Sequence, residues 1–353
     1  MSTKETLNEL LLEVINQTGS DLHLSEGRKP IIRVQGDLIT LNKYEIFSKE
    51  DIVSFLKEMV PIEFIKDFNK KQQIDFSHAY KDVARFRGNA FVQSGNFGMV
   101  LRLIPNKIKT IEELDLPNVL NEFANKKQGF FLVVGPVGQG KSTTLAAMIE
   151  KINKERAEHI ITIEDPIEYV YKEKKSLIDQ REVKIDTPTF ATGLHGTFRQ
   201  DVDVILVGEM RGQETISAAV TAAETGHLVF STLHTNNASQ TIDRIIDSFP
   251  AEQQDQIRMQ LSSSLIGIFS QRLIPRISGG LVPAYELLIN NNAISNLIRE
   301  KRTHEIDTVI ETSSDSGMID MNRTLTDLVR RGEITAENAM LHSFRPNVLQ
   351  KMI

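Results

Sequence analysis

The sequence predicts an α/β protein built from two domains, and three observations support that prediction. The chain has 353 residues, which is about twice the usual length of one domain. In the first hundred residues, helical periodicity is mixed with short β-rich runs. From Gly129 onward, short apolar runs alternate with helical patterns, which is typical of a sheet covered by helices. We therefore expect an α+β domain followed by an α/β domain.

The first domain is expected to begin with a helix, because Leu7, Leu11, Val14 and Ile15 recur on one helical face. A second helical pattern covers residues 52–59. The runs predicted to be strands cover residues 21–24, 30–34, 84–91 and 98–104. We expect this domain to span residues 1–105. The polar run 106–117, which contains a proline, is then expected to be the linker.

The second domain is expected to span residues 118–353 and to contain a parallel sheet. Its predicted strands are short, predominantly apolar and about four to six residues long, as buried parallel strands are. They cover residues 130–134, 160–163, 204–207 and 228–231. The domain is expected to end in helices, including one at 334–341, whose apolar faces pack on the core.

Composition excludes several classes of protein. The chain has 41 Lys and Arg against 47 Asp and Glu, a net charge of −6, and no cysteine. A disulfide scaffold, a thiol nucleophile and a thiolate metal site are therefore excluded. No stretch approaches the about 18 apolar residues of a membrane span, and the N-terminal segment is acidic where a secretory signal is basic. We expect a cytosolic protein without a membrane span, and the acidic balance disfavours non-specific nucleic-acid binding.

The strand at 130–134 leads directly into a complete G-x-x-x-x-G-K-[S/T] motif, and a helical pattern follows it. Glycines in such a loop let backbone N–H groups surround phosphate oxygens, the lysine neutralises phosphate charge, and the hydroxyl binds Mg²⁺. The alternative is an ordinary glycine-rich turn. The residues predicted to bind nucleotide here are Gly135, Pro136, Val137, Gly138, Gln139, Gly140, Lys141, Ser142 and Thr143.

Acidic and histidine side chains are predicted at the carboxyl ends of neighbouring strands. The strand at 204–207 is followed by Glu209, which we expect to orient or deprotonate the attacking water and to share Mg²⁺ with Ser142. Glu164 ends the strand at 160–163 and is a candidate for organising Mg²⁺ and water, or a turn residue. His234 follows the strand at 228–231 and is either a site residue or a hydrogen-bonded structural histidine.

Three arginines of the first domain are candidate phosphate-binding residues. Arg85 and Arg87 are two apart in one predicted strand and so share a face, and Arg102 lies in a later strand. Guanidinium groups can stabilise charge on a γ-phosphate. The alternative is that they are surface arginines of an edge strand.

Together these motifs resemble the secretion and pilus ATPases, and within them the PilT family of type IV pilus retraction motors. The resemblance covers nearly the whole chain. Besides the phosphate loop and the strand before Glu209, it rests on residues 19–24, 85–89, the acidic box 164–168, the histidine box 225–234, 243–246 and 293–300.

This resemblance implies a PAS-like N-terminal domain and a RecA-like ATPase domain in a ring-shaped homohexamer. It implies conversion of ATP hydrolysis into pilus disassembly and twitching motility, through an inner-membrane platform protein, at the cytoplasmic base of the pilus machine. A paralogous retraction ATPase is a further expected partner. By resemblance, Lys141 and Ser142 bind ATP and Mg²⁺, Glu209 is catalytic, His227 and His234 sense the γ-phosphate, and the three arginines sense the nucleotide.

The chain departs from the family pattern at a few positions. Ser295, Gly212 and Val202 replace an arginine, an aspartate and a proline, and 224–226 is closer to the accessory PilU-type motors. The alternatives are therefore an accessory motor, or a secretion or pilus-assembly ATPase, which the lack of a tetracysteine zinc module disfavours. A RecA-like nucleic-acid motor and a non-hydrolysing scaffold are less favoured.

Overall fold

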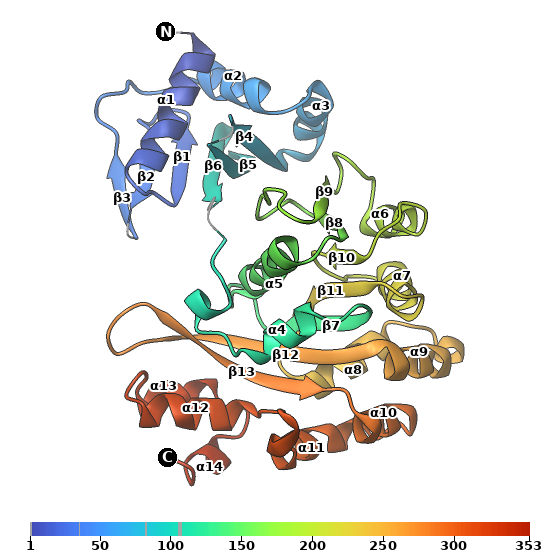
Figure 1. Ribbon diagram of the computed structural model, residues 1–353. Helices are drawn as coiled ribbons and strands as arrows, with labels where there is room; N and C mark the ends of the chain where they lie inside the picture. The colour runs from blue at the N-terminus through green and yellow to red at the C-terminus, as the bar shows by residue number, and fades with distance from the viewer. Residues whose placement is uncertain (1, 35, 82, 105–107) are drawn as a thin grey trace. The chain divides into compact units, whose positions relative to one another are not determined.

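The computed structural model describes residues 2–34, 36–81, 83–104 and 108–353 (Figure 1). Two compact units make up the chain. Met1–Lys107 and Pro166–Val170 form the first unit, and Ile108–Asp165 and Tyr171–Ile353 form the second. Residues 105–107, where the expected first domain ends and the expected linker 106–117 begins, lie outside the described residues.

In its described residues, the first unit has a six-stranded antiparallel sheet with the order β3-β2-β1-β6-β5-β4 (Figure 1). The four predicted strands are confirmed as β1, β2, β5 and β6, whereas β3 and β4 were not predicted. The strands are β1 Asp21–Ser25, β2 Ile31–Val34, β3 Asp37–Thr40, β4 Gln73–Tyr80, β5 Ala84–Gln93 and β6 Asn96–Ile104.

Helices α1 (Thr3–Asn16), α2 (Lys49–Met59) and α3 (Ile62–Lys71) complete the first unit. α1 begins at a capping box, in which the Ser2 hydroxyl accepts from the Glu5 N–H at 3.3 Å and the Glu5 carboxylate accepts from the Ser2 N–H at 2.7 Å. Its apolar face is buried with α2 and one face of the sheet in a single core. The predicted helical periodicity is thus confirmed.

The second unit contains, in the part of the chain described, a seven-stranded sheet with the order β13-β12-β7-β11-β10-β8-β9. Every neighbouring pair from β12 to β9 is parallel, and only β12 and β13 pair antiparallel. The predicted parallel sheet is confirmed, but the β12–β13 hairpin was not predicted. The strands are β7 Gly129–Val134, β8 His159–Glu164, β9 Leu177–Glu182, β10 Val204–Val207, β11 Leu228–Leu233, β12 Leu265–Pro275 and β13 Leu281–Ile289.

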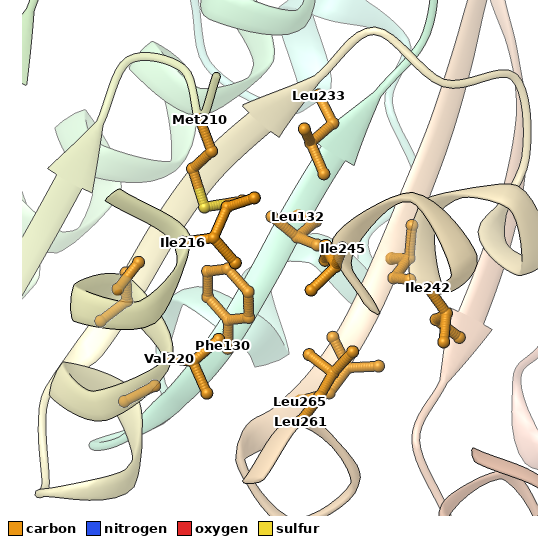
Figure 2. Close-up of a cluster of buried hydrophobic side chains, with 14 of the residues drawn as sticks. Phe130, Leu132, Met210, Ile216, Val220, Leu233, Ile242, Ile245, Leu261 and Leu265 are labelled. Carbon is orange, nitrogen blue, oxygen red and sulfur yellow. The ribbon is translucent and has the colours of Figure 1, made fainter. Parts of the chain in front are cut away.

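Helices cover both faces of this sheet. Successive side chains of β7 point to opposite faces and therefore contact different helices. Phe131 contacts the ring of Phe123 in α4, with 4.5 Å between ring centroids. Phe130 and Leu132 lie in one cluster with side chains of α7, α8 and α9 (Figure 2). The helices flanking the sheet are α4 Val119–Ala124, α5 Lys141–Glu155, α6 Phe190–Thr197, α7 Gln213–Glu224, α8 Ala238–Asp247 and α9 Ala251–Ser264.

The second unit ends in short helices: α10 Asn292–Arg299, α11 Ile306–Thr312, α12 Met321–Arg330, α13 Ala336–His342 and α14 Pro346–Leu349. The helix expected at 334–341 is present as α13. Ile334 and Ala339 are buried with α12 and the β12–β13 hairpin, so this region packs on the core as predicted. Among the described residues, no helix is both long and apolar enough to cross a lipid bilayer.

Candidate nucleotide-binding site

The four predicted site segments of the second unit follow four adjacent parallel strands. In the order β7-β11-β10-β8, they are the phosphate loop after β7, His234 after β11, Glu209 after β10, and Glu164 at the end of β8. Because parallel strands end at the same edge of a sheet, all four segments meet at one carboxyl edge. In open α/β sheets this edge is where ligands bind.

The phosphate loop connects β7 to the N-terminus of α5, and two of its glycines are required by their surroundings. A Cβ on Gly135, whose φ is +148°, would lie 2.5 Å from the backbone oxygen of Gln271. A Cβ on Gly140, whose φ is +78°, would lie 2.9 Å from the side-chain nitrogen of Gln271. The loop therefore needs glycine both for its backbone conformation and for its close approach to β12. Ser142 and Thr143 follow in the first turn of α5.

Lys141 is buried and its ammonium group folds back over its own loop. Nζ donates to the backbone oxygens of Gly135 and Pro136, each at 2.9 Å, and lies 3.3 Å from Nδ1 of His234. An ammonium group has three protons and no acceptor, so it can only donate to these partners. A bound phosphate would replace carbonyl oxygens as the acceptor.

His234 joins Lys141 to Glu209. Its Nδ1 faces an ammonium group, which only donates, so Nδ1 accepts and the ring proton is on Nε2. Nε2 lies 3.8 Å from Oε2 of Glu209. Burial lowers the pKa of His234, the nearby Lys141 charge lowers it further, and Glu209 only partly opposes them. The imidazole is therefore neutral near pH 7, as the assigned tautomer requires.

Glu209 is largely buried just beyond β10, and an arginine of the same segment occupies one of its oxygens. Oε1 of Glu209 lies 2.6 Å from Nε of Arg211, whose side chain is otherwise exposed. The second oxygen faces His234. Lys141, His234 and Glu209 thus form a continuous chain of polar contacts from the phosphate loop to the candidate water-orienting carboxylate.

Glu164 is buried at the end of β8, next to the strand that leads to Glu209. Its Oε1 accepts from the Thr162 hydroxyl at 2.7 Å and from Nε2 of Gln180 at 3.4 Å. The next acid of this segment has a different partner: Asp165 pairs with Lys184 at 3.0 Å. Of the acidic box, Glu164 is the carboxylate that the fold places at the carboxyl edge as a buried side chain.

His227 is not brought together with His234. It precedes β11, whereas His234 follows it, and a strand of this length extends about 20 Å. The ring Nδ1 of His227 lies 2.9 Å from the backbone oxygen of Ala222, and its ring meets Phe198 edge-on with 5.8 Å between centroids. The structure therefore places His227 at the other end of β11 from His234, and its expected role in sensing the γ-phosphate stays a prediction.

The three predicted arginines lie on one face of the first unit's sheet. Arg87 in β5 is directly opposite Arg102 in β6, and Arg85 is two residues earlier in β5. Nη2 of Arg85 donates to the Ser77 hydroxyl at 2.7 Å, and Nε of Arg102 donates to Asp21 Oδ1 at 2.8 Å. The shared face is confirmed. Nucleotide binding by these arginines stays a prediction.

Sequence reasoning missed two residues of β12 that lie next to the phosphate loop, namely Gln271 and Arg272. Both are buried, and Gln271 donates to the backbone oxygen of Gln139 at 2.7 Å. The available signal was a run of three polar residues, Ser270 to Arg272, inside an otherwise apolar strand. Buried polar side chains need partners, so such a run indicates tertiary contacts.

The family model described as "Type II/IV secretion system protein" matches residues 2–304. The chain belongs to this family. The chain is 46% identical to the "Type IV pilus retractation ATPase PilT" of Pseudomonas aeruginosa, over 94% of this chain and 96% of that protein. It is 40% identical to the "Type IV pilus ATPase PilU" of the same organism, over 98% of this chain and 90% of that protein.

A solved structure supports the same assignment. The crystal structure of the pilus retraction motor PilT with bound ADP matches with a TM-score of 0.90 and 46% identity, covering 98% of both chains. The expected family, and the expected α/β fold with an N-terminal domain before a RecA-like ATPase domain, are therefore confirmed.

Proposed function

We propose that this protein is an ATP-hydrolysing motor that powers retraction of a type IV pilus. The observation that carries the proposal is the contact chain from Lys141 through His234 to Glu209 at the carboxyl edge of the sheet. Such an edge joins a phosphate loop to a carboxylate able to orient water. The full-length similarity to PilT, at 46% identity, supports pilus retraction as the work that hydrolysis drives.

Phosphate binding falls to the loop and the first turn of α5. The loop N–H groups and the positive end of the α5 dipole attract the β- and γ-phosphates. The ammonium of Lys141 exchanges the carbonyl oxygens of Gly135 and Pro136 for phosphate oxygens. His234 contacts Lys141. It therefore lies where it can respond to the γ-phosphate of ATP, which a diphosphate lacks.

Glu209 acts on the attacking water once its carboxylate is released from Arg211. The Arg211 side chain is exposed, so it can turn outward into solvent, whereas the largely buried Glu209 stays in place. A carboxylate within reach of water can orient it or accept its proton. In this reading, the Glu209–Arg211 pair is a resting arrangement that nucleotide binding opens.

Mg²⁺ is the proposed cofactor, with the hydroxyl of Ser142 and the carboxylate of Glu209 as the oxygen ligands. Within the described ranges, no three His, Cys, Asp or Glu side chains gather into a metal-binding group. A magnesium ion at a phosphate loop needs fewer protein ligands, because phosphate oxygens and water supply the rest. The hard oxygen donors present fit this ion, whose charge would offset that of the phosphates.

The proposal extends to the assembly. We expect a homohexameric ring that acts at the cytoplasmic face of an inner membrane on a pilus platform protein, alone or with a paralogous retraction ATPase. The similarity to both PilT and PilU supports this expectation. Electron micrographs of the purified protein with an ATP analogue test the ring, and co-purification with the platform protein tests the partner.

The first test measures ATP binding and turnover in the purified full chain. Lys141→Ala is expected to abolish hydrolysis and to weaken ATP binding by about two orders of magnitude, as loss of a phosphate-paired charge would. Lys151→Ala is the matched control, since Lys151 lies on the same helix and its ammonium pairs with Glu155, away from the phosphate loop. Removal of Mg²⁺ with a chelator is expected to stop turnover. Unaltered hydrolysis in Lys141→Ala contradicts an ATPase at this loop.

The second test distinguishes retraction from assembly in the source organism. A strain lacking the gene is expected to carry surplus pili and to lose twitching motility. Wild-type protein and Lys151→Ala restore both, and Lys141→Ala restores neither. Loss of pili on deletion indicates an assembly ATPase instead, and stimulation of hydrolysis by DNA or RNA indicates a nucleic-acid motor.

A further inference from the structure

Strand β12 extends beyond the end of its neighbour and runs beside the phosphate loop. The β12–β7 pairing ends at Ser270 opposite Val134, the last residue of β7. β12 continues to Pro275, held on its other side by β13. Gln271 and Arg272 therefore lie next to the loop that replaces β7 at this edge. Neither residue has a role in the proposed chemistry so far.

The buried amide of Gln271 connects the phosphate loop to helix α5. Only 2% of Gln271 is exposed. Its Nε2 donates to the backbone oxygen of Gln139 at 2.7 Å, and its Oε1 accepts from the Thr144 hydroxyl in α5 at 2.6 Å. The same Nε2 sets the close approach that requires glycine at 140. A further hydrogen bond joins the loop to β12, since the Gln139 side chain accepts from the Leu273 N–H at 2.7 Å.

Arg272 connects the same stretch of β12 to the segment that carries His234. Its Nη1 donates to the backbone oxygen of Gln271 at 3.0 Å, and Nη2 donates to the side-chain oxygen of Asn236 at 2.9 Å. Asn236 is two residues after His234. The guanidinium also lies over the ring of Phe344, 5.3 Å from its centroid, which fixes its orientation.

Together these contacts form a network of linked residues around the phosphate site. Lys141 touches His234, Asn236 binds Arg272, Arg272 adjoins Gln271, and Gln271 returns to the loop. We infer that Gln271 and Arg272 are positioning residues, with Gln271 fixing the phosphate loop and Arg272 fixing the His234 segment for nucleotide binding and turnover. The inference rests on the proposed ATPase function and adds to it two residues that do not touch the reacting atoms.

The chemistry at Gln271 is specific to an amide. One atom must donate to a carbonyl oxygen while the other accepts from a hydroxyl, and a side-chain amide does both without charge. Glutamate would place a second acceptor against the Gln139 oxygen. Methionine would fill the same volume but leave both partners unsatisfied in a buried position, which costs free energy. Gln271→Met therefore removes the bridge with little change of shape.

The test compares Gln271→Met with a matched buried amide at the other end of α5. Asn153 is fully buried and donates to the Lys172 backbone oxygen at 2.8 Å. Asn153→Leu loses similar bonds far from the loop. We expect Gln271→Met to weaken ATP binding about tenfold, which equals about 1.4 kcal/mol, and Asn153→Leu to lower only the melting temperature. Equal, near-wild-type ATP affinity in both variants, with wild type binding ATP, overturns the positioning role of Gln271.

A double-mutant cycle tests the same bond from its other end. Thr144→Val removes the hydroxyl that Oε1 of Gln271 accepts from. If the bridge carries the effect, Gln271→Met and Thr144→Val are non-additive in ATP affinity. Additive losses contradict the bridge. The cycle still tests the bridge when Gln271→Met is destabilised, because the bridge also requires Thr144→Val alone to weaken ATP binding.

Arg272→Met tests the second half of the inference through a split between kinetic constants. Releasing Asn236 is expected to lower kcat about tenfold while changing ATP affinity less, since the loop contacts of Gln271 remain. Unchanged kcat with a folded variant overturns the role of Arg272. Failure of wild-type protein to bind ATP is a different outcome, which overturns the proposed function itself.

Discussion

Glu286 is a buried carboxyl group in β13, and its replacement by glutamine is expected to change how stability depends on pH. Only 4% of Glu286 is exposed. Its Oε1 accepts from the backbone N–H of Ala238, at the start of α8, at 2.9 Å, and from the Ser270 hydroxyl at 3.3 Å. Burial raises the pKa of Glu286 to about 7, although the hydrogen bonds from Ala238 and Ser270 oppose this and the charges of Asp307 and Asp320 add to it.

The direction of the effect follows from which state holds the proton. Below its ordinary pKa of 4.5 the carboxyl is protonated in the folded and unfolded chain, and above about 7 it is ionised in both. Between these values only the folded state keeps the proton, so the free energy of unfolding falls as pH rises. Over this window the loss amounts to about 3 kcal/mol.

Glu286→Gln keeps the acceptor oxygen and the shape but cannot ionise. We expect the variant to gain stability relative to wild type as pH rises from about 5 to about 8, by up to about 3 kcal/mol. Urea unfolding of both proteins across this range measures the difference. Glu337→Gln, an exposed substitution on α13, is the control and should show no such trend. A stability difference between Glu286→Gln and wild type that does not change with pH refutes the reasoning.

Two further predictions concern the second unit. Leu261→Ala opens a cavity in the cluster of Figure 2 and is expected to lower the free energy of unfolding by about 3 kcal/mol. Met259 lies on the same helix but is 57% exposed, so Met259→Ala should cost little. Equal costs of the two variants in urea unfolding contradict this prediction. His159 has an acceptor at each ring nitrogen; burial opposes the charged ring, but hydrogen bonds to Asp179 and to two backbone oxygens outweigh it and raise the pKa of His159. This stabilisation is present below pH 6.5 and lost as pH rises through the raised pKa, so Asp179→Asn should lower the His159 pKa in an NMR titration and destabilise more, by about 1 kcal/mol, at acid than at alkaline pH.

The parallel sheet and its phosphate loop could be predicted because their signals are local. Buried parallel strands are largely apolar on both faces, so β7, β8, β10 and β11 appear as short, predominantly apolar runs. Strand-end residues such as Glu209 and His234 then fall at one edge by topology alone. The antiparallel hairpin β12–β13 was missed because Ser270, Gln271 and Arg272 interrupt the apolar pattern with side chains whose partners are distant in sequence.

Two features of the site were not predicted from the sequence, and each has a physical cause. One is the separation of His227 from His234, since strand β11 lies between them and its extended backbone carries them to opposite edges of the sheet. That separation was already implied by the apolar run 228–231. The other is the pairing of Glu209 with Arg211, which could not be predicted because it depends on how the chain turns after β10.

The most direct test of the central claim is ATP turnover by wild type and Glu209→Gln, measured on the full chain with Mg²⁺. The glutamine variant cannot accept a proton from water but retains Lys141 and the loop. We predict that it still binds ATP and hydrolyses it at least about a hundredfold more slowly than wild type. Hydrolysis at the wild-type rate, with ATP bound, would contradict the account.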